Sequence, residues 1–445
     1  MRLRSVILAL ALGACSIGVS ASASSARATT CQGQPATVIG EPRQDVLRGT
    51  SGPDVIITNG AQTTQGFGGD DLICSNGRLG TIQEYGTSID AGAGNDTVDA
   101  SRSGREADVF VDLGPGDDTY LGGDLITDVV TALNEETGAA EGSDTITTGD
   151  GVDYVATGSP DPSNPDTDTV DLGAGADELG ILGATDESRP IEGGPGRDLV
   201  YLGDPLFAAP TTIDNSTGRL ISLVGPLAAW ASFERFQLDS EGDYTPPRFV
   251  GGDGREYVES RITLNDADLG GGRDTLELVP PEAPDTQGVE LEGGLGTDRF
   301  FYHQFIAQQS VIYRLGTGAM TFGRNPSSTP YAHVTGFERN DLSVKWLQVT
   351  GSAGADQVRW NACTGSVSGW KGDDRLAWSP FRFSNGIGRC RDDGNISVRG
   401  QGGDDVLVGG ALNDVLLGGA GADSADGGRG TDRCRAETRS SCEKR

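Results

Sequence analysis

Residues 400–432 read GQGGDDVLVGGALNDVLLGGAGADSADGGRGTD. This stretch contains aspartates at intervals of nine residues, namely Asp405, Asp414, Asp423 and Asp432. Each aspartate ends a Gly-rich turn, and two positions after each stands a candidate for the core, namely Leu407, Leu416, Ala425 and Cys434. Self-similarity at a short fixed period predicts a repeat architecture.

The nine-residue unit has a simple physical interpretation. Glycine tolerates positive φ angles and lets the chain turn tightly, while the three residues after each aspartate form a short strand whose middle side chain points inward. Two units make one coil, so turns on the same side recur every eighteen residues and stack about 4.8 Å apart. We therefore expect Asp405 to lie over Asp423 and Asp414 over Asp432.

Stacked aspartates would repel each other by roughly 3 kcal/mol at an effective dielectric constant of 20. A hard divalent cation removes this repulsion, and ligation by oxygen alone suits calcium. The Gly-Gly-x-Gly-x-Asp pattern resembles the secreted hemolysin-type calcium-binding (RTX) repeat proteins of bacteria.

This resemblance implies calcium sites between stacked turns, each formed by two aspartates and four backbone carbonyls. One implied site comprises Gly400, Gly402 and Asp405 with Gly419, Gly421 and Asp423. The next comprises Gly409, Ala411 and Asp414 with Gly428, Gly430 and Asp432. Leu412 departs from the pattern because it stands where the family has a glycine.

Single copies of the unit are scattered through the rest of the chain. Pairs with the nine-residue step give weaker metal candidates, namely Asp45, Asp54, Asp144, Asp153 and Asp177. Most scattered aspartates are interpreted as turn formers, because Asp-Gly turns need no metal.

A longer period of 100 residues relates Asp198 to Asp298, and Phe233-Glu234-Arg235 matches Phe337-Glu338-Arg339 at a separation of 104. We interpret these matches as a duplication.

The predicted organisation is a signal peptide (1–28), a β-solenoid with degenerate repeats (29–189), two duplicated solenoid blocks (190–290 and 291–390) and a tandem calcium-binding β-roll with a C-terminal cap (391–445). Three-residue spacing of aromatic side chains also predicts a short helix over residues 227–236.

The N-terminus has the form of a secretory signal peptide with cleavage after Ala28. A less favoured alternative is a lipid anchor at Cys15, which follows Leu12-Gly13-Ala14. The apolar run is too short to span a membrane. Six cysteines then remain, and proximity favours pairing in order, as Cys31–Cys74, Cys363–Cys390 and Cys434–Cys442.

Composition limits the function further. The 445 residues include 65 acidic and 34 basic ones, which gives a net charge of −31 and excludes nucleic acid and anionic membranes as partners. The predicted fold is all-β, a right-handed parallel β-roll or β-helix solenoid built from Gly/Asp-rich repeats, with ends stapled by disulfides.

The predicted function is that of a secreted calcium-binding protein that folds on binding extracellular Ca²⁺ and has a structural or adhesive role, with a cell-surface polysaccharide as a candidate partner. We expect no enzymatic activity, because His303 and His333 have no spacing relation to a nucleophile. One alternative is a carbohydrate-active lyase, epimerase or hydrolase, which a cleft with converging Arg, Asp and Tyr side chains would favour. Another is carbohydrate binding by an exposed row of Trp346, Trp360, Trp370 and Trp378.

Overall fold

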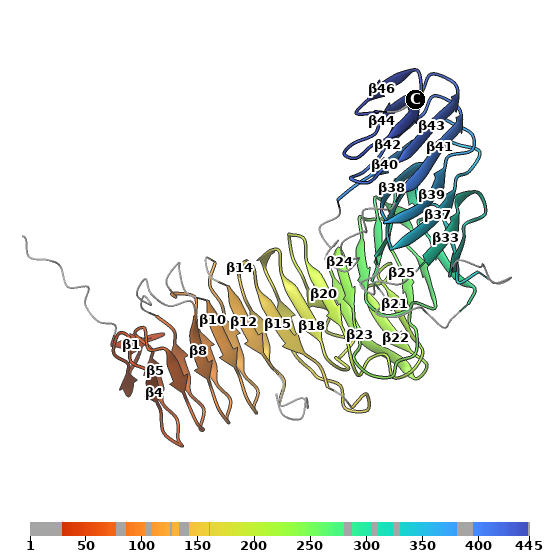
Figure 1. The fold of residues 1–445 in the computed structure, drawn as a ribbon. Coiled ribbons are helices and arrows are strands. Elements are labelled where there is room, and N and C mark those ends of the chain that lie inside the picture. Colours follow the sequence, from red (N-terminus) through yellow and green to blue (C-terminus); the bar gives the residue numbers. More distant parts are fainter. Residues whose placement is uncertain are drawn as a thin grey trace, which may run out of the picture.

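The computed structural model describes residues 29–76, 86–103, 108–124, 127–132, 142–159, 161–279, 287–303, 310–323, 330–380 and 395–443. The predicted signal peptide, Cys15 and Cys390 lie outside these residues. Within them, helical structure is confined to the 3-10 turn η1 (Leu315–Thr317), and no helix is long and apolar enough to cross a membrane. The chain is a parallel β-solenoid (Figure 1).

One sheet runs without interruption along the whole solenoid, and every neighbouring pair of its strands is parallel. We call it the continuous sheet. Its strands are β4 (Val46–Arg48), β6 (Thr63–Gln65), β8 (Thr87–Asp90), β10 (Val109–Asp112), β12 (Asp128–Thr131), β15 (Tyr154–Thr157), β18 (Glu178–Ile181), β20 (Leu199–Leu202), β24 (Arg235–Leu238), β26 (Tyr257–Ser260), β29 (Thr275–Leu278), β32 (Arg299–His303), β36 (Arg339–Ser343), β38 (Gln357–Asn361), β40 (Arg375–Trp378), β42 (Val406–Val408), β44 (Ser424–Asp426) and β46 (Thr438–Ser440).

The opposite sheet is also mainly parallel, but antiparallel insertions interrupt it twice. We call it the interrupted sheet. Its parallel strands are β3 (Val38–Ile39), β5 (Val55–Ile57), β7 (Leu72–Cys74), β9 (Thr97–Asp99), β11 (Thr119–Leu121), β13 (Thr145–Thr147), β16 (Thr169–Asp171), β19 (Ile191–Glu192), β23 (Gly225–Ala231), β21 (Thr211–Asp214), β25 (Arg248–Val250), β27 (Asp266–Asp268), β30 (Val289–Glu292), β35 (Ala332–Thr335), β33 (Ser310–Arg314), β37 (Trp346–Thr350), β39 (Thr364–Ser368), β41 (Ile396–Gly402), β43 (Val415–Ala420) and β45 (Arg433–Arg435).

The two insertions have the same form. In the first, β22 (Arg219–Ser222) lies antiparallel between β21 and β23, and in the second, β34 (Ala319–Phe322) lies antiparallel between β33 and β35. The inserted strands begin 100 residues apart, which is the period found in the sequence. The block boundaries at 190, 290 and 390 stay a prediction. Short pairs between turns complete the fold, namely β14 (Asp150–Gly151) with β17 (Ala174–Gly175) and β28 (Gly271–Gly272) with β31 (Leu295–Gly296).

The core lies between the two sheets, where the middle residue of each short strand points inward. Leu407, Leu416, Ala425 and Cys434 are all at most 3% exposed, as the nine-residue unit predicts. The stack of buried side chains continues from Leu47 at the N-terminal end of the solenoid to Cys434 at the other. Because each coil buries its side chains against its neighbours, stability is shared along the whole axis.

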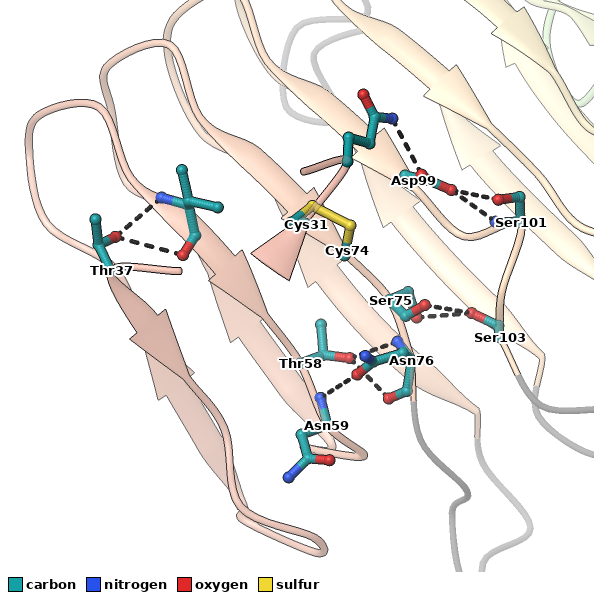
Figure 2. The surroundings of a disulfide bond; sticks show 12 residues. Cys31, Thr37, Thr58, Asn59, Cys74, Ser75, Asn76, Asp99, Ser101 and Ser103 are labelled. Atoms are coloured by element: carbon teal, nitrogen blue, oxygen red, sulfur yellow. Dashed lines mark hydrogen bonds between the residues drawn. A yellow bond between two sulfur atoms is a disulfide. The ribbon is translucent and has the colours of Figure 1, made fainter. Parts of the chain in front are cut away.

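Disulfides tie down both ends of the solenoid. The hairpin of β1 (Thr30–Cys31) and β2 (Gln34–Pro35) is joined to β7 by the Cys31–Cys74 bond (Figure 2). At the other end, Cys434–Cys442 links β45 to the last residues of the chain. Both pairings were predicted. The third predicted pair, Cys363–Cys390, includes a residue outside the described part of the chain.

The short helix predicted over residues 227–236 is wrong. This segment forms the end of β23 and the start of β24, with Trp230 and Phe236 both buried and their ring centroids 5.9 Å apart. Ser232 has a φ of 63°, which bends the chain between the two strands. The aromatic side chains therefore reach one core from two strands, and their three-residue spacing reflects this bend.

Candidate metal sites

The aspartates at the sixth position of the Gly-rich turns stack in register from coil to coil. The backbone N–H of Asp405 donates to Oδ1 of Asp423 at 3.0 Å, and that of Asp414 donates to Oδ1 of Asp432 at 2.7 Å. Register pairing of β42 with β44, and of β43 with β45, holds these turns together. The stacking predicted from the eighteen-residue coil is confirmed.

The same hydrogen bond recurs along much of the chain and forms what we call the aspartate ladder. In each case the N–H of one turn aspartate donates to Oδ1 of its equivalent in the next coil, at 2.7–3.0 Å. One column comprises Asp54, Asp71, Asp96, Asp118, Asp144 and Asp168. A second comprises Asp128, Asp153, Asp177 and Asp198, and a third comprises Asp356, Asp374, Asp405 and Asp423. A fourth runs from Glu256 through Asp274 to Asp298.

Glutamates end several segments of the ladder. The N–H of Asp198 donates to Glu234 at 3.1 Å, and that of Asp298 donates to Glu338 at 2.6 Å. At the C-terminal end, the N–H groups of Asp423 and Asp432 donate to carboxylates of the terminal cap, at 2.8 Å each; the acceptors are Glu437 and Glu443. The sequence showed the repeated Phe-Glu-Arg, but its period alone did not reveal this role.

In most ladder aspartates, one oxygen is used by the ladder and the other has no partner. The Oδ2 atoms of a dozen such residues are buried without a hydrogen bond, in Asp71, Asp96, Asp118, Asp153, Asp177, Asp198, Asp274, Asp298, Asp374, Asp405, Asp423 and Asp432. All of these residues are at most 3% exposed. A buried charged oxygen without a partner is costly, so a cation or a proton must compensate it.

Burial raises the pKa of many of these carboxyl groups, and neighbouring carboxylates add to the effect. The pKa of Asp118 rises to about 8 and that of Asp374 to about 7, while hydrogen bonds from the ladder oppose the rise. The pKa values of Asp71, Asp96, Asp177 and Asp198 rise to about 6 from the same causes. At the tandem turns, burial also raises the pKa of Asp405 and Asp432.

A second class of turn has no such vacant oxygen. In the turn 409–414, Oδ2 of Asp414 accepts the N–H of Gly410 at 2.7 Å, and Oδ1 accepts the N–H of Ile396 at 3.0 Å. We call such turns capped. Leu412 occupies the fourth position here, where Gly403 and Gly421 have φ angles of 128° and 139°. A leucine resists that conformation, so the departure seen in the sequence coincides with a different turn.

Asp54 also belongs to a capped turn. Its Oδ2 accepts the N–H and hydroxyl of Thr50, and its Oδ1 accepts the hydroxyl of Thr37. Burial alone would raise the pKa of Asp54, but these hydrogen bonds outweigh it and leave the pKa lowered. Both oxygens of this weaker metal candidate are therefore occupied by the protein.

The remaining weaker candidates fall into different places. Asp45 is exposed. Asp144 lies in the first ladder column, whereas Asp153 and Asp177 are adjacent in the second. Two aspartates nine residues apart, such as Asp144 and Asp153, therefore belong to opposite sides of one coil.

Backbone carbonyls complete the surroundings of Asp405 and Asp423. The carbonyls of Gly400 and Gly402 accept N–H groups of the preceding turn, at 3.1 and 2.9 Å. The carbonyls of Gln401 and Gly403 instead lie against the next turn, where a Cβ on Gly419 or Gly421 would come within 2.3 or 2.0 Å of them. The Gln401 and Gly403 carbonyls thus lie between the turns of Asp405 and Asp423, and the carbonyl set implied by the resemblance stays a prediction.

A second row of side chains, missed by the sequence reasoning, lies at the fifth turn position. The N–H of Asp404 donates to Oδ1 of Asp373, and the N–H of Ala422 donates to Oδ1 of Asp404, both at 2.8 Å. The N–H of Asn95 similarly donates to Asp70 at 3.0 Å. The signal was present in the sequence as doubled Asp-Asp or Asn-Asp pairs at the ends of turns.

The four tryptophans do not form one exposed row. Trp360 is fully buried, whereas Trp370 is 46% exposed on a turn with the Lys371 ammonium 5.6 Å from its ring centroid. Trp360 and Trp378 are register partners and line a cavity of 310 Å³ beside the turn 409–414. His303 is buried and His333 is half-buried.

A family model of the RTX calcium-binding nonapeptide repeat matches the chain at four places, residues 39–61, 88–102, 139–159 and 399–434. The chain contains RTX repeats. No curated protein matches it. The C-terminal RTX match includes the turns of Asp405 and Asp423, which we call open because the Oδ2 atom of each aspartate has no partner. The other three matches include ladder residues such as Asp54, Asp96 and Asp153.

The open turns of the RTX repeats fit a hard divalent cation. They offer buried carboxylate oxygens without a partner, carbonyl oxygens at the neighbouring turn, and a cradle that a Cβ would fill. Among the described residues, no group of three or more His, Cys, Asp or Glu side chains converges on one point. A cation in these turns would therefore depend on backbone carbonyls as well as on the ladder aspartates.

Proposed function

We propose that this is a secreted calcium-binding protein whose C-terminal β-roll completes its folding when Ca²⁺ binds between the RTX turns. Its role is structural or adhesive, outside the cell. The observation that carries this proposal is the pair of buried, unpartnered Oδ2 atoms of Asp405 and Asp423 in adjacent turns. A divalent cation bound there would compensate the negative charge of these two oxygens.

Calcium would act here as a folding ligand. Without a cation, carboxylates one strand spacing apart, about 4.8 Å, repel each other by roughly 3 kcal/mol at an effective dielectric constant of 20. Because the unfolded chain has no preformed site, binding to the folded form stabilises it, by about 2.7 kcal/mol when calcium is at 100 times its dissociation constant.

Export and calcium binding support each other in this proposal. The predicted signal peptide directs the chain outside, and sites of the extracellular class bind calcium with dissociation constants of about 0.1–1 mM. Such sites would stay empty at cytosolic calcium levels and load after export. The chain would then gain its final stability only where it functions.

Calcium calorimetry on the mature chain tests the proposal. We expect saturable binding, and we expect Asp423→Asn to remove about one ion per chain. The matched control is Asp54→Asn, whose carboxylate is occupied by Thr37 and Thr50 and should leave the ion count unchanged. Absence of calcium binding, or an equal loss in both variants, would refute the proposal.

The proposal includes no catalytic step. An Arg–Asp–Tyr set does occur on the outer face of the continuous sheet, where Asp341 binds Arg299 and Arg359 and the hydroxyl of Tyr257 donates to Glu277. The carboxylates of this set are buried and bonded to protein groups. They are therefore poorly placed to act on a substrate as acid or base.

A further inference from the structure

Four arginines gather on the outer face of the continuous sheet, across the neighbouring strands β32, β36, β38 and β40. Register pairing aligns Arg299 with Arg339, then Gln357, then Arg375 in one row. Arg359 stands two residues beyond Gln357, in the next row, opposite Asp341. We call Arg299, Arg339, Arg359 and Arg375 the arginine patch.

One buried carboxylate, that of Asp341, holds two of the four arginines of the patch in place. Asp341 is 1% exposed and forms ion pairs with both Arg299 and Arg359, whose side chains are 33% and 44% exposed. The Arg359 Nε donates to Oδ1 of Asp341 at 2.7 Å, and the Arg299 guanidinium also lies 5.3 Å from the ring centroid of Phe301. These contacts hold two guanidinium groups in place while leaving part of each at the surface.

The other two arginines have no acidic partner in the described part of the chain. Arg339 and Arg375 are exposed and form no ion pair with another described residue. The nearby Glu277 is 5% exposed and already accepts the hydroxyl of Tyr257. The patch therefore presents an excess of positive charge on a chain whose net charge is −31.

We infer that the arginine patch is a docking surface for a carboxylated polysaccharide, a polymer of uronate sugars that lies along the solenoid axis. Arginine matches carboxylate through two parallel hydrogen bonds, and Asp341 on β36 shows that arginines of the two flanking strands, β32 and β38, can share one carboxylate here. The extracellular setting of this polymer rests on the proposed function.

Spacing favours a sugar polymer over an acidic peptide. Arg339 and Arg375 stand two strand spacings apart in their row, with Gln357 between them, so their charges are about 9.6 Å apart along the axis. An extended uronate polymer carries one carboxylate on each sugar ring and turns successive rings to opposite sides, so that carboxylates of one face recur every second ring, a repeat comparable to two strand spacings. An extended peptide places side chains of one face about 6.6 Å apart, which does not follow the strands.

Binding of short oligoglucuronates to the calcium-loaded mature chain tests this inference, with cello-oligosaccharides of equal length as the uncharged counterpart. The variant Arg339→Gln/Arg375→Gln should bind oligoglucuronate at least about tenfold more weakly, the loss expected for one charge-assisted hydrogen bond. The matched control is Arg433→Gln/Arg435→Gln, which removes the same charge from two exposed residues of β45 and should change affinity less than about twofold.

Several results would overturn the inference. They are absence of oligoglucuronate binding, equal binding of cello-oligosaccharides, equal losses in both double variants, or equally tight binding of poly-glutamate. Calcium calorimetry on Arg339→Gln/Arg375→Gln should give the ion count of the unmodified chain. This readout separates failure of the docking surface from failure of the calcium sites.

Discussion

Replacing Asp423 by Asn should shift stability in opposite directions with and without calcium. The carboxamide keeps the oxygen that accepts the N–H of Asp405, 3.0 Å away, so the ladder persists. It replaces the unpartnered Oδ2 by an NH₂ group, which cannot bind a cation. The substitution therefore removes a charge and a ligand while changing little in shape.

The magnitude follows from the geometry of the stack. In chelator, loss of one carboxylate removes a repulsion of up to roughly 3 kcal/mol from Asp405, one strand spacing away, so the variant should be more stable than the parent. In calcium at 100 times the dissociation constant, loss of one site costs about 2.7 kcal/mol, so the variant should be less stable. The difference between the two conditions is the quantity predicted.

Amide hydrogen exchange of residues 400–432, measured in chelator and in calcium, checks this prediction locally. Asp54→Asn is the matched control, because hydrogen bonds from Thr37 and Thr50 occupy its oxygens and lower its pKa. It should destabilise its own coil by a similar amount in both conditions. If Asp423→Asn also shifted protection equally in both, the cation would have no role at this turn and the reasoning would fail.

Three further predictions concern the cap, the turns and pH. Glu437→Ala leaves the buried N–H of Asp423 without its acceptor and should cost about 1–3 kcal/mol in urea unfolding, whereas the neighbouring Arg439→Ala should cost less than 0.5 kcal/mol. Gly421→Ala places a Cβ 2.0 Å from the carbonyl of Gly403 at a φ of 139° and should lower the melting temperature of the calcium-loaded form; Gly52→Ala, whose Cβ would meet nothing within 4 Å, serves as its control. The pKa of Asp118 is raised from 3.8 to about 8, so its contribution to stability is fully present below pH 3.8 and is lost as pH rises through 8; thermal melts in chelator should show this decline, and a melting temperature that rises over this window would contradict it.

Much of the solenoid was predictable because the residues that its turns and core require recur at a fixed period in the sequence. The spacing of Asp405 and Asp423 indicates the length of one coil, and Leu407 and Leu416 indicate which face of the strands points inward. The cysteine pairs at the two ends followed from proximity. The period shows which residues are equivalent, and in a stack of similar coils equivalent residues occupy equivalent places in space.

The finer features of the sites depended on backbone geometry that a period does not encode. Nothing in the spacing of Asp414 distinguishes it from Asp405, yet Oδ2 of Asp414 is bound by Gly410. The direction of each carbonyl also depends on the φ and ψ angles of the turn: the Gly400 and Gly402 carbonyls accept from the preceding turn, and the Gln401 and Gly403 carbonyls lie against the next one. The bend at Ser232 likewise comes from one positive φ angle, which the aromatic spacing does not encode, so the helix predicted from that spacing was wrong.

The aspartate ladder also makes the coils depend on one another in one direction. Each turn N–H needs the carboxylate of the coil that follows it in the chain, and no coil needs the one before it for this bond. Unfolding of one coil therefore leaves a buried N–H without an acceptor only in the coil that precedes it in the chain. Glu234 and Glu338 each satisfy such a donor without a further ladder carboxylate, so this dependence on the following coil stops at each of them. Glu437 and Glu443 end it at the terminal cap.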